Sequence, residues 1–188
     1  MIDYSKFLNN SIQEIKPSGI RKFFDIASEM DDVISLSIGE PDFQTPWHIR
    51  EEGINSLKNG KTWYSPNRGF AQLREEIANY YARRFNISYE GKTQVLVTVG
   101  GSEAIDLAFR CLVSEGDEVI IPEPSFVCYE PLTHMAGGKA VIINTKAEDE
   151  FRLRADDLEK AITDKTRLVV LPFPNNPTGA IMEKEDLE

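Results

Sequence analysis

A short apolar run that ends in two glycines constrains the fold of this chain more than any other feature. Residues 95–99 are β-prone, Gly100 and Gly101 follow, and a helical pattern begins at once. This order predicts a buried strand, a tight turn and a helix whose first backbone N–H groups point into open space. The positive end of the helix dipole lies there and the glycines admit a close ligand, so the place suits a phosphate.

The first helical turn carries two polar residues with separate roles. Ser102 is a candidate helix cap or hydroxyl donor, and Glu103 places a carboxylate near the dipole. An ordinary strand–turn–helix connection with a capping serine explains the same residues. The decision between the two interpretations therefore depends on the rest of the chain.

Strands and helices alternate along the sequence after the double glycine. Apolar strands are predicted at residues 118–122, 140–144 and 167–171, with helices at 125–136 and 155–162. Short, nearly unbroken apolar strands between helices are typical of a parallel sheet that helices cover on both faces. The pattern therefore predicts an α/β fold.

Three unusual loops follow predicted strand ends, at residues 100–104, 122–126 and 172–179. Ligands of parallel sheets bind at the carboxyl ends of the strands, which share one edge. Convergence of the three loops favours a ligand site over three unrelated turns.

The first half of the chain is predicted to be mainly helical. A helix is expected at 18–30, a short strand at 33–38, a helix from Pro46 to near Gly60, and a long amphipathic helix after Gly69. Residues 1–17 are polar and irregular, as in an arm that packs on a neighbouring subunit or a frayed terminus.

Charge and apolar patterning exclude several classes of partner. The net charge is −10, which argues against nucleic acid and anionic membranes, because both require a basic face. No apolar run approaches the ~20 residues of a membrane helix, and no signal-peptide core stands at the N-terminus. Cys111 and Cys128 lack CxxC spacing, so we expect reduced thiols in a cytoplasmic protein.

Other common sites find no support in the sequence. His48 and His134 are far apart without metal-ligand spacing, so no metal site is predicted. The glycine patterns of dinucleotide-binding and P-loop proteins do not occur.

The stretch PNNPTG at residues 174–179 closely resembles a motif of the class I and II aminotransferases, which are fold-type-I pyridoxal-phosphate (PLP) enzymes. The resemblance covers essentially the whole chain, and four further stretches match in the family's order and spacing: 39–43, 64–69, 100–104 and 124–129. It implies PLP as the cofactor and the family's three-layer α/β/α large domain, with a mostly parallel sheet.

The resemblance also implies roles for individual residues. Gly101, Ser102 and Glu103 match the turn whose backbone N–H groups hold the PLP phosphate. Phe126 matches the aromatic residue that stacks on the pyridine ring, and Asn176 matches the side chain that hydrogen-bonds the phenolic oxygen. Without the motif, Phe126 is a core phenylalanine and Asn176 a turn asparagine.

Two more matches involve a second subunit and the substrate. Tyr64 matches a tyrosine that reaches the PLP phosphate of the other subunit in a homodimer, although a hydrophobic loop anchor explains it too. Gly39 matches a loop that closes over the substrate and contacts its carboxylate. Pro124 and Pro177 match cis prolines of the family.

The family's Schiff-base lysine, its acidic partner of the pyridine nitrogen and its substrate-binding arginine all lie beyond the PNNPTG motif. No catalytic residue is therefore assigned within residues 1–188, and this chain alone is expected to be inactive. We expect the N-terminal portion of a larger enzyme, with an arm and small-domain segment at 1–45 and an incomplete PLP-binding large domain at 46–188. In the family, strands of the missing half lie between the 95–99 and 167–171 strands.

The function implied by the resemblance is transfer of an amino group between an amino acid and a 2-oxo acid. A PLP-dependent C–S or β-lyase or synthase of the same fold remains an alternative. A non-catalytic, aminotransferase-like ligand-binding module is a second one.

Overall fold

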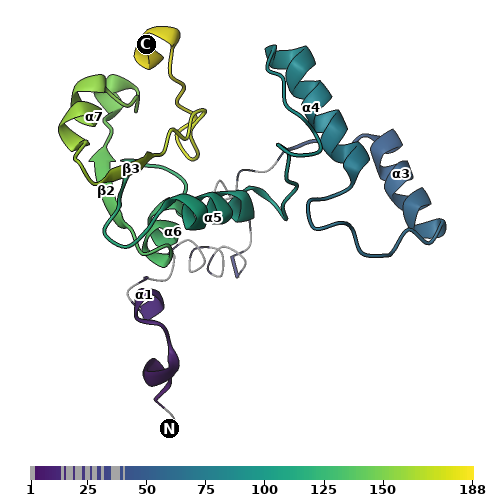
Figure 1. Cartoon of the computed structure of the whole chain (residues 1–188), viewed down its shortest axis with the longest axis horizontal. Helices are drawn as coiled ribbons and strands as arrows, with labels where there is room; N and C mark the ends of the chain where they lie inside the picture. Colours follow the sequence, from purple (N-terminus) through teal and green to yellow (C-terminus); the bar gives the residue numbers. More distant parts are fainter. Residues whose placement is uncertain are drawn as a thin grey trace. The chain divides into compact units, whose positions relative to one another are not determined.

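The structure is a computed structural model that describes residues 3–13 and 41–188, with single positions between them at 15, 19, 23, 26, 29, 30, 32–34 and 39. The chain divides into two compact units (Figure 1). One unit comprises Met1–Ser18 and Val99–Glu188, and the other comprises Gly19–Thr98. Each unit is described by itself.

A three-stranded parallel sheet forms the centre of the first unit. Its strands are β1 (Glu118–Glu123), β2 (Lys139–Asn144) and β3 (Thr166–Val169), in the order β2-β1-β3. Strand β1 pairs with β2 in unbroken register, and an irregularity between Glu118 and Val119 interrupts its pairing with β3. All three predicted strands are thus confirmed, with shifted ends.

Helices surround this sheet. Helix α5 (Gly101–Leu112) packs beside α6 (Tyr129–Met135), and α7 (Ala155–Ala161) contacts β2 (Figure 1). Short helices complete the unit: η1 (Tyr4–Phe7), α1 (Asn10–Gln13), η2 (Ala147–Asp149) and α8 (Lys184–Leu187).

The core explains why β1 is the central strand. Val119 and Ile121 pack with Phe109 and Val113 in one cluster. Ile120 is fully buried although its side chain points to the opposite face of the sheet. Burial on both faces is what the continuous apolar sequence of this strand predicts.

The predicted strand at residues 95–99 does not form. A strand needs a hydrogen-bonded neighbour, and no described strand lies beside these residues. The Val97 N–H instead donates to the Arg68 carbonyl oxygen, and Val99 is 92% exposed. Apolar sequence alone is insufficient to make this segment a strand.

The predicted helix at 125–136 begins only at Tyr129. Pro131 has no N–H and fits without loss only within the first helical turn. A helix that began at Ser125 would place this proline in its interior. The four residues before Tyr129 form a loop instead, which extends the connection at the end of β1.

The second unit contains the predicted helices α3 (Trp47–Lys58) and α4 (Ala71–Phe85). Helix α4 ends at Asn86, which adopts the left-handed conformation with φ 56°. The Arg74 guanidinium donates to the carbonyl oxygens of Gly91 and Lys92 and so fixes the turn after α4. Most of the helix predicted at 18–30 and of the strand predicted at 33–38 lies outside the described residues.

Across the described residues, no helix has both the length and the apolar character that crossing a membrane requires.

Candidate active site

Two loops that leave the carboxyl ends of β1 and β3 are joined by one buried side chain. Asn175 is 6% exposed, and its Nδ2 donates to the Pro124 carbonyl oxygen at 2.8 Å. Pro124 directly follows β1, and Asn175 belongs to the loop after β3. Two of the three loops predicted to converge thus lie together, whereas the loop at 100–104 follows no strand in the described part of the chain.

The backbone around Asn175 closes a tight turn. The Asn175 N–H donates to the Ala180 carbonyl oxygen, and the Gly179 N–H donates to the Asn175 carbonyl oxygen, both at 2.8 Å. Gly179 has φ 73°, a conformation that glycine adopts without steric cost. Asn176 lies within this closed turn with its side chain exposed, and that side chain forms no hydrogen bond with the described residues.

The N-terminus of α5 is open, as the double glycine predicts. Gly100 precedes the helix with φ 85°, and no side chain caps it, so the predicted capping role of Ser102 is wrong in this structure. A Cβ added at Gly100 or Gly101 would meet nothing within 4 Å. The backbone N–H groups of Gly101 and Ser102 find no acceptor among the described residues.

Glu103 folds back on this turn. Its carboxylate accepts a hydrogen bond from the Val99 N–H, immediately before the turn. The negative charge is therefore engaged by backbone at the positive end of the dipole. The two N–H groups of Gly101 and Ser102 remain available for an anion.

Phe126 stands in the loop after β1. Its ring is half-buried and meets Tyr129 edge to face, with centroids 6.1 Å apart and planes at 86°. Burial raises the pKa of Tyr129 and of Cys128. Cys128 and Tyr129 therefore stay uncharged at neutral pH.

Three peptide bonds in the two loops are cis: Glu123–Pro124, Phe173–Pro174 and Asn176–Pro177. The matches of Pro124 and Pro177 to cis prolines are confirmed. The cis bond before Pro174 was not predicted, and Asn175 was not singled out either, although two adjacent asparagines between prolines mark an unusual turn.

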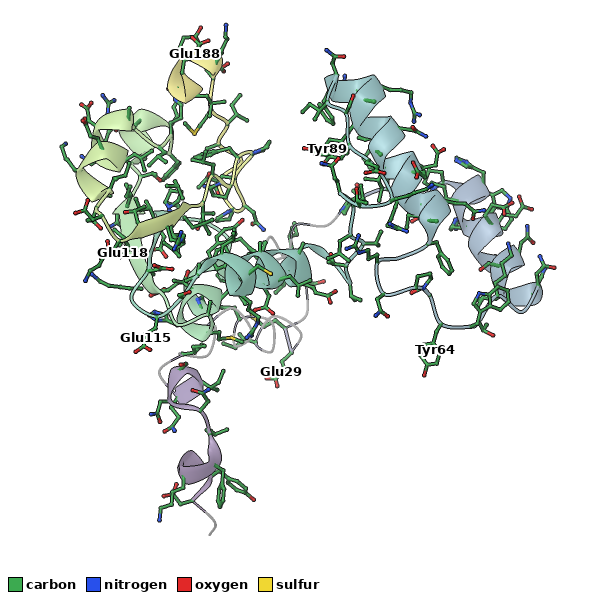
Figure 2. All side chains as sticks on the ribbon, viewed as in Figure 1. Glu29, Tyr64, Tyr89, Glu115, Glu118 and Glu188 are labelled. Atoms are coloured by element: carbon green, nitrogen blue, oxygen red, sulfur yellow. The ribbon has the colours of Figure 1, made fainter. Side chains whose placement is uncertain are left out.

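Tyr64 and Gly39 belong to the other unit. Tyr64 is 100% exposed and points away from the ribbon of its own unit (Figure 2). A Cβ at Gly39 would meet nothing within 4 Å. Their roles stay predictions.

No cluster of three or more metal-binding side chains occurs in the part of the chain that the structure describes.

This geometry defines a parallel α/β unit in which two joined loops lie at the carboxyl ends of the strands, the edge where ligands of such sheets bind. Comparison with known proteins gives the family. Residues 31–188 match the family described as Aminotransferase class I and II, so the chain belongs to that family.

Individual relatives agree with this assignment. The aromatic-amino-acid aminotransferase 2 of Thermococcus litoralis is 45% identical over 181 residues, which cover 96% of this chain and 46% of that protein. The aspartate aminotransferase of Pyrococcus abyssi is 44% identical with the same two coverages. The crystal structure of Pyrococcus protein-A1 superposes with a TM-score of 0.90 at 46% identity, over 95% of this chain and 46% of that one.

This chain spans about half the length of the curated relatives it matches. Members of the family are PLP-dependent enzymes.

The described residues fit the parts of PLP. The free N–H groups at the start of α5 suit a phosphate, and the open space at Gly100 and Gly101 leaves room for it. Phe126 offers a half-buried aromatic face for a pyridine ring, and the exposed amide of Asn176 offers an N–H donor for a phenolate oxygen.

Proposed function

We propose that this chain is the N-terminal part of a PLP-dependent aminotransferase that moves an amino group between an amino acid and a 2-oxo acid. The observation that carries the proposal is the hydrogen bond from Asn175 to Pro124, because it joins the loop of Asn176 to the loop of Phe126. The open start of α5 belongs to the same compact unit. Aromatic and aspartate aminotransferases among the relatives support the reaction class.

When bound, PLP supplies an electron sink for the bond changes at the substrate's α-carbon. The residues of this chain bind and orient it. The N–H groups at Gly101, Ser102 and Glu103 hold the phosphate, Phe126 packs on the ring, and Asn176 donates a hydrogen bond to the phenolate oxygen. This donor stabilises the ionised phenolate and so sets the protonation of the bound cofactor.

The rest of the site comes from elsewhere. In the proposed homodimer, Tyr64 of each subunit reaches the phosphate held by the other, and Gly39 contacts the substrate carboxylate through its backbone. Residues 1–45 form an arm and small-domain segment, and 46–188 form part of the large domain. The parent protein is the longer chain that carries residues 1–188 together with the lysine that bonds covalently to PLP. In it, that lysine follows these residues.

Borohydride reduction of the PLP-treated parent protein, followed by intact mass measurement, tests the cofactor assignment. One reduced pyridoxyl adduct per chain is the expected result, and no specific adduct would overturn the proposal. A matched sample of residues 1–188 alone is expected to carry no specific adduct, because no lysine in it has the family's context.

A substrate assay separates the two enzymatic readings of the fold. An aminotransferase converts an added 2-oxo acid into its amino acid in step with consumption of the amino donor. Release of ammonia and pyruvate without an acceptor would identify a β-lyase instead. Aspartate and an aromatic amino acid are the first donors to compare.

A further inference from the structure

We propose that Asn175 is a positioning residue of the cofactor site, which fixes Asn176 and Phe126 relative to each other. The inference rests on the proposed function, since it concerns how this chain holds PLP. It assigns a role to a side chain that does not itself contact the cofactor.

Asn175 joins two segments that are 51 residues apart in sequence. Its Nδ2 reaches the Pro124 carbonyl oxygen at 2.8 Å. Pro124 is two residues from Phe126, and Asn175 is next to Asn176. In the described part of the chain, no other side chain of residues 170–183 hydrogen-bonds to a segment outside its own loop and α8.

The surroundings of this bond make it directional and hard to replace with water. Asn175 is 6% exposed, and the two backbone bonds to Ala180 and from Gly179 hold its main chain in place. The bond is part-buried, where a hydrogen bond is stronger than in water, and its loss removes the protein donor of the Pro124 carbonyl oxygen.

The other end of the amide supports a role beyond stability. Asn175 Oδ1 is buried and has no hydrogen-bond partner among the described residues. An unpaired buried acceptor costs free energy. The side chain is therefore placed so that Nδ2 keeps its hydrogen bond while Oδ1 stays unpaired. An aspartate at this position would bury a negative charge and could not donate a hydrogen bond to the Pro124 carbonyl oxygen.

Substitutions of Asn175 in the PLP-loaded parent protein test the proposal. Asn175→Asp removes the donor at nearly constant size, Asn175→Ala removes the side chain, and Asn175→His keeps a ring N–H donor. The control is Asn79→Asp, the same change at an exposed position of α4. The readouts are the PLP dissociation constant, the pH midpoint of the cofactor's visible absorption change, and the melting temperature without PLP.

The expected result for Asn175→Asp and Asn175→Ala is roughly tenfold weaker PLP binding, as for loss of one buried hydrogen bond. The absorption midpoint moves to higher pH, because Asn176 no longer donates well to the phenolate. Asn175→His restores both values toward wild type, and Asn79→Asp changes neither.

A purely structural role gives a different pattern. If the Asn175 variants melt at lower temperature but bind PLP with the wild-type constant and midpoint, the proposal is overturned. If Asn175→Asp fails to fold, the PLP dissociation constants and absorption midpoints of Asn175→Ala and Asn175→His distinguish the positioning role from the purely structural one. Absence of PLP binding by the wild-type parent protein would overturn the proposed function and this inference with it, whereas wild-type binding with unaffected Asn175 variants overturns the inference alone.

Discussion

The side chain of Asn176 is exposed and forms no hydrogen bond with the described residues, and two backbone hydrogen bonds close the turn around it. An amide in this state is ready to donate without first breaking a bond in the protein. The neighbouring Asn175 is its opposite, buried and committed to Pro124. We propose that Asn176 presents the donor and that Asn175 holds its loop.

We predict that Asn176→Ala in the parent protein weakens PLP binding and raises the pH midpoint of its visible absorption change. The phenolate oxygen loses its donor and then retains a nearby proton to higher pH. A spectroscopic pH titration measures the midpoint, with Asn79→Ala, at an exposed position of α4, as the control. Titration curves that superpose on wild type would remove Asn176 from the site.

Glu118 is an ion-pairing residue at the opposite end of β1 (Figure 2). Thr163 Oγ1 donates to its carboxylate at 2.7 Å and Lys139 Nζ at 3.1 Å, and these bonds lower the pKa of Glu118. The unfolded chain therefore binds more protons than the folded one over the interval between the two pKa values, and stability rises with pH there.

We predict that the bonds to Glu118 stabilise the folded protein in full at pH values above the ordinary glutamate pKa of about 4.3. This stabilisation is lost as the pH falls through the lowered pKa that Glu118 has in the folded protein. Glu118→Gln should lower the urea midpoint at pH 7 and flatten its decline in acid. Glu159→Gln, at an exposed position of α7, is the control; equal pH profiles for the two variants would contradict the assignment.

The junction between α6 and β2 shows how tightly two elements meet. A Cβ at Gly138 would lie 2.5 Å from Val113 Cγ1 and 3.2 Å from both the Asp117 oxygen and Thr133 Cγ2. Only a residue without a side chain lets β2 begin so close to the core. The contact places the start of β2 against the core, beside the central strand β1.

Gly138→Ala is therefore predicted to destabilise the first unit by about 1–3 kcal/mol, the usual cost of overpacking. Gly53→Ala within α3, where a Cβ meets nothing within 4 Å, should be neutral or stabilise by up to about 1 kcal/mol. Urea unfolding of both variants measures the difference. A Gly138→Ala variant as stable as wild type would show that Val113 moves aside freely.

The sequence predicts the helices that follow from local spacing and the strands that pair with other strands of this chain. The strands β1, β2 and β3 follow from apolar runs, and α4 and α5 follow from helical spacing. Residues 95–99 have equally apolar sequence and form no strand, because pairing depends on a neighbour that no local pattern encodes. Asn175 could not be predicted for a related reason, because the partner of its side-chain hydrogen bond lies 51 residues away in sequence.

At the scale of the whole molecule, many large apolar side chains of the described residues are exposed. In the second unit, Trp63, Tyr64, Leu57 and Phe43 are all more than half exposed. Large apolar patches mark surfaces that other protein covers. This agrees with a chain that spans about half the length of its relatives.

Residues 1–188 by themselves are therefore predicted to associate and to bind a hydrophobic dye, unlike the parent protein. Sedimentation velocity over a range of concentrations measures the association, with the parent protein as the reference. A monodisperse, dye-negative monomer of residues 1–188 would favour an independent binding module instead.

The central claim is that this chain contributes the phosphate, ring and phenolate contacts of a PLP site. A crystal structure of the parent protein with bound PLP tests it most directly. We expect the phosphate on the N–H groups at Gly101 and Ser102, the ring on Phe126, and the phenolate oxygen on the Asn176 amide. PLP bound away from the start of α5 and from these two loops would contradict it.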